Sequence, residues 1–474
     1  MMRTRNNLLE GPIAKSLLTL ALPIVLANVL QAGYQLIDAF WVGRLGGAAV
    51  AAVSVSTPVM FLTIALGVGF AVAGSTLIAQ YFGAGNKKMV DHVAAQTLLM
   101  ILMVSVVLGA LGYIFTPKIL RLMGVAPDVY QGAVGFMRVS FIGLVFNFFF
   151  FMFQSIMRGV GEARLQVYIV LGTVILNFIL DPLIIFGWGP LPAMGVKGAA
   201  IATVSTQSIA ALIGLSVLLR GKYGIHLSWS HFKPDPAFIK RAFLLGFPAS
   251  IEQSARALGL TVLTFLIASF GTLTVAAYGV GSNMLQLVII PAMGLSMSIS
   301  TLVGQNIGAG NIKRAAEIGK LGALIGFGVL SFLGFIVFIF APQLVAFFVP
   351  GDTAVIESGA KFLHIISLSW GFMAVQLCLT GVLRASGNMM VTMVLALVSQ
   401  WVLQFPLAYV LSKHTSLGIT GLWWSFTATN IIIAVITMLW YAKGDWKKTK
   451  ITTEEERLSR EVSDEVAAED SIRQ

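Results

Sequence analysis

Long apolar runs alternate with short polar breaks along almost the whole chain. Runs such as 98–114, 139–152 and 321–341 are apolar on every side rather than along one stripe, which is not the pattern of an amphipathic surface helix. Together with their flanks, these runs reach the roughly 20 residues that a helix needs to cross a bilayer. The pattern therefore predicts membrane-spanning helices.

Glycines, prolines and clusters of charge mark the breaks between these runs. They divide the chain into twelve expected spans, which makes it an all-α integral membrane protein with both termini on one side. The expected spans are 14–41, 50–81, 91–116, 131–158, 163–187, 195–219, 239–269, 275–306, 316–345, 359–385, 388–412 and 418–442.

Basic residues gather before the first span and in alternate breaks. Cytoplasmic loops carry the excess of Lys and Arg, so these breaks and both termini are expected in the cytoplasm of a multi-pass protein of the cell membrane. Met1–Glu10 is polar and the first apolar run is long, so no cleaved signal is expected. The basic groups are Arg3, Arg5 and Lys15; Lys87 and Lys88; Arg158 and Arg164; Arg220 to Arg241; Lys313 and Arg314; and Arg384.

Composition agrees with a membrane protein. Hydrophobic residues make up 57% of the chain and charged residues 11%, where a soluble domain carries about 25% charge, and the mean hydropathy is +0.88. The net charge of +11 follows from the scattered loop residues, so it does not indicate a nucleic-acid partner. The single cysteine, Cys378, excludes an internal disulfide and a multi-cysteine metal site.

The chain repeats itself. A shift of 225 residues superposes polar as well as apolar positions, which chance apolar similarity would not preserve. Each copy holds six spans, as in transporters whose two lobes enclose a central cavity. We expect an N-lobe (1–222), a cytoplasmic linker (223–238), a C-lobe (239–443) and a charged cytoplasmic tail without fixed structure (444–474). The shift pairs Pro23 with Pro248, Gln80 with Gln305 and Gly83–Asn86 with Gly308–Asn311, and a shift of 226 pairs Arg158 with Arg384.

Only three acidic residues fall inside the apolar spans: Asp38, Asp181 and Glu252. A carboxylate at the bilayer centre costs roughly 2.5–3.5 kcal/mol, so each needs a partner or a function. Asp38 shares a helical stripe with Gln31 and Tyr34, and Pro23 on the same span would kink it and act as a hinge. The alternative is that Asp38 reaches the outer interface and Pro23 is a static bend.

Asn177 precedes Asp181 by four residues, so both side chains leave one face of a helix. Their oxygens, with the hydroxyl of Thr203 on the next span, suit Na⁺ or a shared proton. Two carboxylates in one dry lobe do not both ionise readily, so proton and Na⁺ would compete for the site formed with Asp38. The alternative is a buried polar cluster that fastens helices.

Glu252 precedes Arg256 by four residues, the favourable order for a helical ion pair. We expect this pair to be structural or to act as a gate rather than to contact substrate. Asn147 and Gln154, seven residues apart on the fourth span, are expected to face the same cavity as Asp38.

Several short motifs lie in the first half of the chain: Leu22-Pro23, Asp38–Gly43, Gln80 with Gly83–Asn86, Met157–Gly159, Asn177–Pro182 and Gly195–Thr203. On these motifs the chain resembles the multidrug and toxic compound extrusion (MATE) family from Gly11 to about Lys443. The resemblance implies an antiporter that exports bulky, often cationic compounds, with Gln31, Tyr34 and Gln154 lining the cavity. It further implies the family's DinF-like branch, whose amino-lobe cation site matches Asp38, Asn177, Asp181 and Thr203, because the carboxy-lobe counterparts, Leu263 and Phe405, are apolar.

Three other classes of membrane protein are alternatives to an antiporter. A flippase for lipid-linked saccharides, from the same wider superfamily, would favour additional spans and a strongly basic cavity. An intramembrane enzyme needs a catalytic cluster, and an ATP-driven pump needs a phosphate-binding loop; the sequence has neither. We therefore expect a secondary active transporter, not an enzyme, that is monomeric, contacts the bilayer and small organic substrates, and uses no cofactor beyond its coupling ion, H⁺ or Na⁺.

Overall fold

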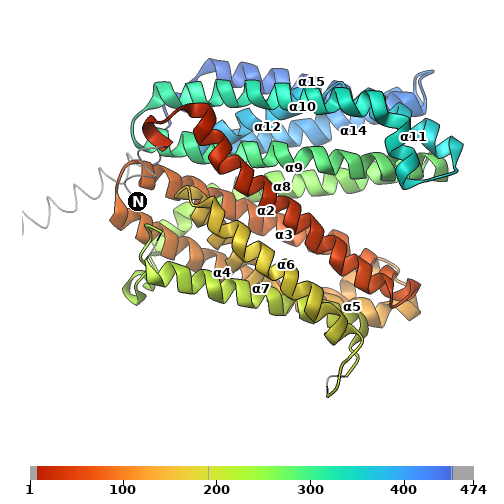
Figure 1. Cartoon of the computed structure of the whole chain (residues 1–474), viewed down its shortest axis with the longest axis horizontal. Helices are drawn as coiled ribbons and strands as arrows, with labels where there is room; N and C mark the ends of the chain where they lie inside the picture. Colours follow the sequence, from red (N-terminus) through yellow and green to blue (C-terminus); the bar gives the residue numbers. More distant parts are fainter. Residues whose placement is uncertain (1–7, 191, 222, 450, 452–474) are drawn as a thin grey trace, which may run out of the picture.

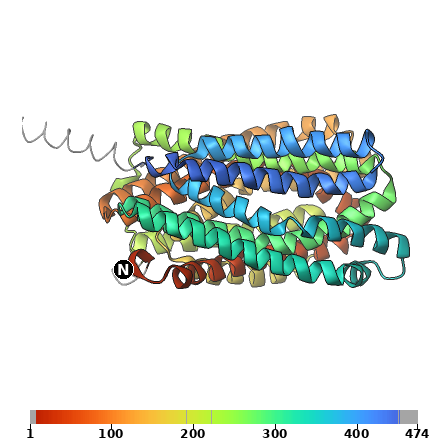
Figure 2. The same ribbon diagram turned by 90° about the horizontal axis from the view of Figure 1, so that it is seen from above.

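The computed structural model describes residues 8–190, 192–221, 223–449 and 451. Eleven of its helices are long and apolar enough to cross a membrane, and one further pair, bent by 50°, completes a twelfth span. Most membrane-length helices of the second half of the chain run close to the long axis of the molecule in both views (Figures 1 and 2), whereas Ile13–Gly43 and Ala163–Ile185 run obliquely in Figure 1. The predicted all-α, twelve-span architecture is confirmed.

Six spans form each lobe. The N-lobe contains α2 (Ile13–Gly43), α3 (Gly47–Gly83), α4 (Lys87–Leu122), α5 (Pro127–Gly159), α6 (Ala163–Ile185) and α7 (Gly195–Arg220). The C-lobe contains α8 (Pro236–Ala268), α9 (Thr272–Gly308), α10 (Ile312–Phe348), the bent pair α11 (Thr353–Ser367) and α12 (Trp370–Ala385), then α13 (Met389–Leu397), the π-helix η2 (Val398–Gln404) and α14 (Phe405–Lys413) as one span, and α15 (Ile419–Lys443).

Most helices extend a few residues beyond the expected spans. Arg158 and Arg384, which were counted among the basic residues of the breaks, lie in the last turns of α5 and α12, at the ends of the expected spans 131–158 and 359–385. Arg384 is largely buried, with 14% of its side chain exposed. Its assignment to a solvated cytoplasmic loop is therefore wrong.

The internal repeat recurs in the backbone. Gly46 and Gly271, 225 residues apart, precede α3 and α9 with φ values of 103° and 95°. Gly85 and Gly310, at the same separation, have φ values of 78° and 80°. Residues with a Cβ rarely adopt these conformations, so the duplicated glycines give both lobes the same tight turns, one between their first and second spans and one between their second and third.

Equivalent helices pack in equivalent ways. In the N-lobe, α5 packs on α3, α4 and α7, while α2 packs on α6; in the C-lobe, α12 packs on α9, α10 and α15, while α8 packs on α13. The lobes meet through α3 with α8, α2 with α9, and α3 with α9. Because α2 begins beside α9 and ends beside α6, it runs obliquely from one lobe to the other (Figure 1).

Two glutamines related by the repeat join the lobes reciprocally. Gln80 Nε2 donates to the carbonyl of Ala385 at 2.7 Å, and Gln305 Nε2 donates to the carbonyl of Gly159 at 2.9 Å. Other hydrogen bonds between the lobes, among the described residues, run from Thr76 to the Arg384 carbonyl, from Ser250 to Leu66, from Ser298 to Leu17 and from Arg314 to Gly11. These hydrogen bonds lie in the middle of the bundle or in the half where the basic loop residues are.

The start of the charged tail is folded. Trp446, in the short helix η3 (Asp445–Lys447), is 1% exposed and stacks on Tyr441. Ile451 N donates to Gln80 Oε1 at 3.1 Å, so the tail reaches the junction between the lobes. The predicted lack of structure is wrong for residues 445–449, because an aromatic residue and backbone donors find partners there; residues 452–474 lie outside the described part of the chain.

Candidate functional site

The four predicted coupling residues lie together in the N-lobe. Thr203 Oγ1 on α7 donates to Asp38 Oδ2 on α2 at 3.2 Å, and Asn177 Nδ2 donates to Asp181 Oδ1 along α6 at 3.1 Å. The carboxyl groups of Asp38 and Asp181 are close enough to share a hydrogen bond when one of them is protonated. Three helices thus bring their oxygens to one place.

Helix packing explains this meeting. The end of α2 lies against α6, and α6 lies against α7. The spacing of four residues puts Asn177 and Asp181 on the face of α6 that turns inward, where both side chains are 0% exposed. Asp38 is partly buried as a residue, but its Oδ1 is not exposed. The alternative that Asp38 merely reaches the outer interface does not describe this geometry.

Several oxygens in the site have no donor. Asp38 Oδ1, Asn177 Oδ1 and Asp181 Oδ2 are buried and make no hydrogen bond. Buried polar atoms are nearly always satisfied, and leaving one unsatisfied costs about 1–3 kcal/mol. The oxygens present fit a proton or a hard cation such as Na⁺. Among the described residues, no group of three or more His, Cys, Asp or Glu side chains offers a site for a transition metal.

Tyr34 completes the site from within the lobe. It is 3% exposed, and its hydroxyl lies 2.7 Å from Thr206 Oγ1, which in turn donates to the Thr203 carbonyl. This hydrogen bond holds the Tyr34 ring inside the N-lobe, and Gln31, on the same helix, is partly buried. That both side chains line a substrate cavity stays a prediction. Thr206 was not predicted as part of this site, although it follows Thr203 by three residues on the same helical face.

The two polar residues expected from α5 lie apart from this site. Gln154 is 7% exposed and accepts a hydrogen bond from Gln166 Nε2 at 2.8 Å, so it fastens α5 to α6. Asn147 is partly buried, with Oδ1 unpaired. Among the described residues, no hydrogen bond joins either side chain to Asp38. The amide oxygen of Gln154 is used between helices, and that Gln154 and Asn147 face one cavity with Asp38 stays a prediction.

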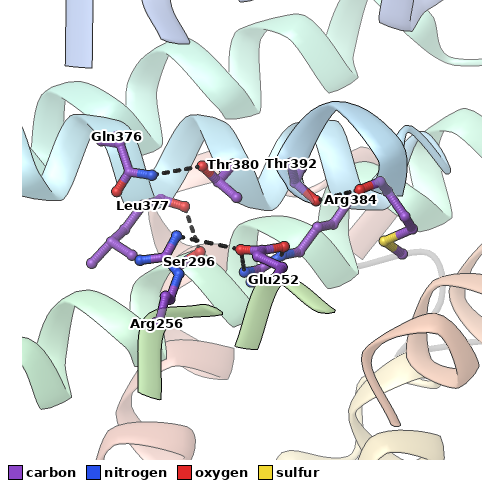
Figure 3. Close-up of polar contacts among 9 residues, drawn as sticks. Glu252, Arg256, Ser296, Gln376, Leu377, Thr380, Arg384 and Thr392 are labelled. Atoms are coloured by element: carbon purple, nitrogen blue, oxygen red, sulfur yellow. Dashed lines mark hydrogen bonds and ion pairs between the residues drawn. The ribbon is translucent and has the colours of Figure 1, made fainter. Parts of the chain in front are cut away.

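Glu252 is the centre of a second charged cluster, in the C-lobe (Figure 3). The predicted ion pair with Arg256 is confirmed at 3.3 Å, and Arg384 from α12 adds a two-point contact, with Nε 3.3 Å from Glu252 Oε2 and Nη2 bonded to Oε1. Glu252 is 1% exposed. Arg384 was not predicted as a partner of Glu252, because 132 residues separate the two in the chain.

Two duplicated six-span lobes around a membrane bundle are typical of multi-pass membrane transporters. The MatE family model matches residues 23–183 and 248–410, one match in each lobe. The chain belongs to the MatE family, whose members are transporters and not enzymes.

Curated relatives match over nearly the whole chain. "Probable multidrug resistance protein YoeA" of Bacillus subtilis is 29% identical, covering 92% of this chain and 95% of its own. "Probable multidrug resistance protein NorM" of Thermotoga maritima is 28% identical, covering 94% and 95%. The "FAD transporter" of Shewanella oneidensis is 27% identical, covering 92% and 95%.

Solved structures agree with the fold. A MATE protein crystallised in complex with MaL6 superposes with a TM-score of 0.87 at 25% identity, covering 94% of this chain and 99% of that one. An outward-facing multidrug resistance MATE transporter superposes with a TM-score of 0.86 at 25% identity, covering 94% and 98%.

Proposed function

We propose that this protein is a multidrug exporter that drives organic compounds out of the cell by antiport with H⁺ or Na⁺. The observation that carries the proposal is the set of unpartnered oxygens shared by Asp38, Asn177 and Asp181. A structural cluster would pair its oxygens with donors, whereas a coupling site must be able to exchange its cation. The printed names of two relatives, both multidrug resistance proteins, support export as the direction.

The shape of α2 suggests how ion binding reaches the rest of the molecule. Asp38 near its end contacts Thr203 of the N-lobe, and Leu17 near its start accepts a hydrogen bond from Ser298 of the C-lobe at 3.0 Å. Pro23 lies between them inside the helix. A change of charge at Asp38 therefore acts on a helix that both lobes hold. If the two conformations bind the cation with different affinity, the cation shifts the equilibrium between them.

The remaining expectations belong to the same proposal. The protein works as a monomer of the cell membrane with both termini in the cytoplasm, and it is organised as lobes 1–222 and 239–443 with a linker at 223–238 and a tail at 444–474. Its coupling site is of the DinF-like kind, and its substrates include organic cations. Pro23 is the hinge of alternating access, and the cluster around Glu252 is structural or acts as a gate.

Transport by purified protein in liposomes tests this proposal. Ethidium export is measured with a pH gradient and with a Na⁺ gradient, each imposed separately, for the wild type and for Asp38→Asn. Asp128→Asn, an exposed carboxylate on α5, is the matched control. Export should follow at least one gradient in the wild type and the control and stop in Asp38→Asn. Gradient-driven export by Asp38→Asn at the wild-type rate would remove the basis of the proposal.

A further inference from the structure

The C-lobe cluster carries an excess of positive charge. Glu252 faces two arginines, Arg256 and Arg384, so the three side chains together have a formal charge of +1. Arg384 makes the two-point contact, which is the stronger geometry for an arginine and a carboxylate. Arg384 therefore neutralises Glu252, and Arg256 is the cation in excess.

Arg256 has donors to spare. Its Nη2 reaches Glu252 Oε1 at 3.3 Å, a long contact for a charged pair, while its buried Nε has no hydrogen-bond partner. The side chain is 29% exposed, compared with 1% for Glu252. A guanidinium that is partly desolvated, incompletely paired and still accessible is suited to binding an anionic group.

The span that packs on α8 is irregular in a way that its N-lobe counterpart is not. The eleventh span contains the π-helix η2, which contacts α8, whereas α6 is unbroken. One turn beyond Arg256, a Cβ at Gly259 would lie 2.6 Å from Gln400 Oε1 of η2, so the glycine makes room for this amide. Broken spans and π-bulges are frequent where transporters and other proteins bind ligands.

The two lobes thus differ in charge at buried sites. The N-lobe holds Asp38 and Asp181, while the position that corresponds to Asp38 in the C-lobe is Leu263, which is 1% exposed. The unpaired oxygens of Asp38 and Asp181 lie in the N-lobe, and Arg256, the arginine that Glu252 does not neutralise, lies in the C-lobe.

We propose that Arg256 binds an acidic group, a carboxylate or a phosphate, of the exported compound. This inference rests on the proposed export function and names a substrate class for it: anionic or zwitterionic compounds, in addition to simple cations. The guanidinium of Arg256 offers a paired set of N–H donors to two oxygens of the acid. Its contact with Glu252 holds the guanidinium in position.

Equilibrium binding tests the inference without any ion gradient. Fluorescence anisotropy of 6-carboxyfluorescein, an anion, and of ethidium, a cation, is measured with protein in phosphatidylcholine nanodiscs. The variants are Arg256→Gln, which removes the charge, and Arg256→Lys, which keeps it. Arg138→Gln is the matched control, because Arg138 is also partly buried with an unpaired Nε but lies over the ring of Tyr113, within the N-lobe.

The expected result is selective for charge. Arg256→Gln should weaken carboxyfluorescein binding by about tenfold or more, as for the loss of a hydrogen bond to a charged group, and leave ethidium binding unchanged or tighter. Arg256→Lys should restore part of the affinity, and Arg138→Gln should bind like the wild type. Elution profile and melting temperature confirm that each variant is folded, which is expected because Arg384 still neutralises Glu252.

Three results would overturn the inference. One is a wild type that binds no carboxyfluorescein, whatever it does with ethidium. Another is an Arg256→Gln variant that binds both dyes as the wild type does, or loses both equally, which would make the arginine purely structural. The third is competition by phosphatidylglycerol in the discs that depends on Arg256, which would assign the arginine to a lipid headgroup. A failure of gradient-driven ethidium export, by contrast, would contradict the antiport proposal and leave these binding results unaffected.

Discussion

At the scale of single residues, the molecule places its few buried charges in two contrasting settings. Asp38 and Asp181 have oxygens without donors, whereas Glu252 accepts from two arginines. An unsatisfied buried oxygen raises the free energy of the folded state unless a cation or a proton compensates for it. We therefore expect ion exchange at Asp38 and Asp181, and structural stabilisation at Glu252.

Because Asp38 and Asp181 share one site, their substitutions should not be additive. Asp38→Asn and Asp181→Asn should each lower ion-driven ethidium export by about tenfold or more, and the double variant should be no worse than either, since the shared site is already lost. Initial rates in proteoliposomes containing equal amounts of protein measure this. Independent, multiplying effects would show that the two carboxylates act at separate sites.

Removal of Glu252 should reduce stability. Glu252→Ala leaves Arg256 and Arg384 with uncompensated buried charge, and breaking a buried ion pair costs about 3–5 kcal/mol. The melting temperature of the detergent-solubilised protein should fall clearly, while Glu357→Ala, on the exposed side of α11, should not change it. Adding Arg384→Leu to Glu252→Ala should recover part of the loss. An unchanged melting temperature for Glu252→Ala would contradict a structural role.

At the scale of elements, α2 differs from α8 although the repeat pairs them. Both contain an interior proline, Pro23 in α2 and Pro248 in α8. Only α2 carries an acidic residue at the far end, because Leu263 replaces it in α8. The same interior proline thus shares its helix with Asp38 in one lobe and with the apolar Leu263 at the corresponding position in the other.

Pro23→Ala should slow transport and preserve ion binding. Alanine restores the missing backbone donor and removes the ring clash, which stiffens the helix by an amount on the order of 3 kcal/mol, so any bending during the cycle becomes harder. Turnover of ethidium should fall while the concentration of Na⁺ or H⁺ that gives half-maximal rate stays the same. Pro248→Ala is the control, and its effect on turnover should be smaller. Equal effects of the two substitutions would remove the hinge role from Pro23.

At the scale of the whole molecule, the lobes are held together by close backbone contact on one side. A Cβ at Gly83 would lie 1.9 Å from the carbonyl oxygen of Gln305, and a Cβ at Gly308 would lie 1.9 Å from that of Gln80. Small residues let membrane helices approach this closely. The two glycines, related by the repeat, therefore define a junction that must separate if the protein is to open towards its basic side.

Gly83→Ala should shift the population towards separated lobes on that side. Spin labels at Lys88 and Lys313, exposed and related by the repeat, in a chain with Cys378→Ala, report the distance by electron paramagnetic resonance. The distance distribution should broaden towards longer values in Gly83→Ala. It should be unchanged in Gly47→Ala, where a Cβ meets nothing within 4 Å. An unchanged distribution in Gly83→Ala would show that the junction tolerates a methyl group without opening.

The number of spans, the duplication and the residues proposed for the coupling site could all be predicted from the sequence. Apolar runs of membrane length must be helical because no water satisfies their backbone in the bilayer, and a carboxylate inside such a run stands out because burying it is costly. Asn177 and Asp181 could be assigned to one face because helical periodicity is local. Their grouping with Asp38 and Thr203 was a prediction that the family resemblance supported, since no local rule brings separate helices together.

The groups that lie far apart in the chain and share a partner could be identified only from the packed helices. Arg384 was predicted in a loop and turned out to bind Glu252, and Tyr34 and Gln154, which were predicted to line a cavity, form hydrogen bonds within the N-lobe with Thr206 and Gln166. The reciprocal hydrogen bonds of Gln80 and Gln305 could not be predicted from the sequence either. A hydrogen bond between helices depends on their rotation and depth in the packed bundle, and the periodicity of a single helix carries no information on either.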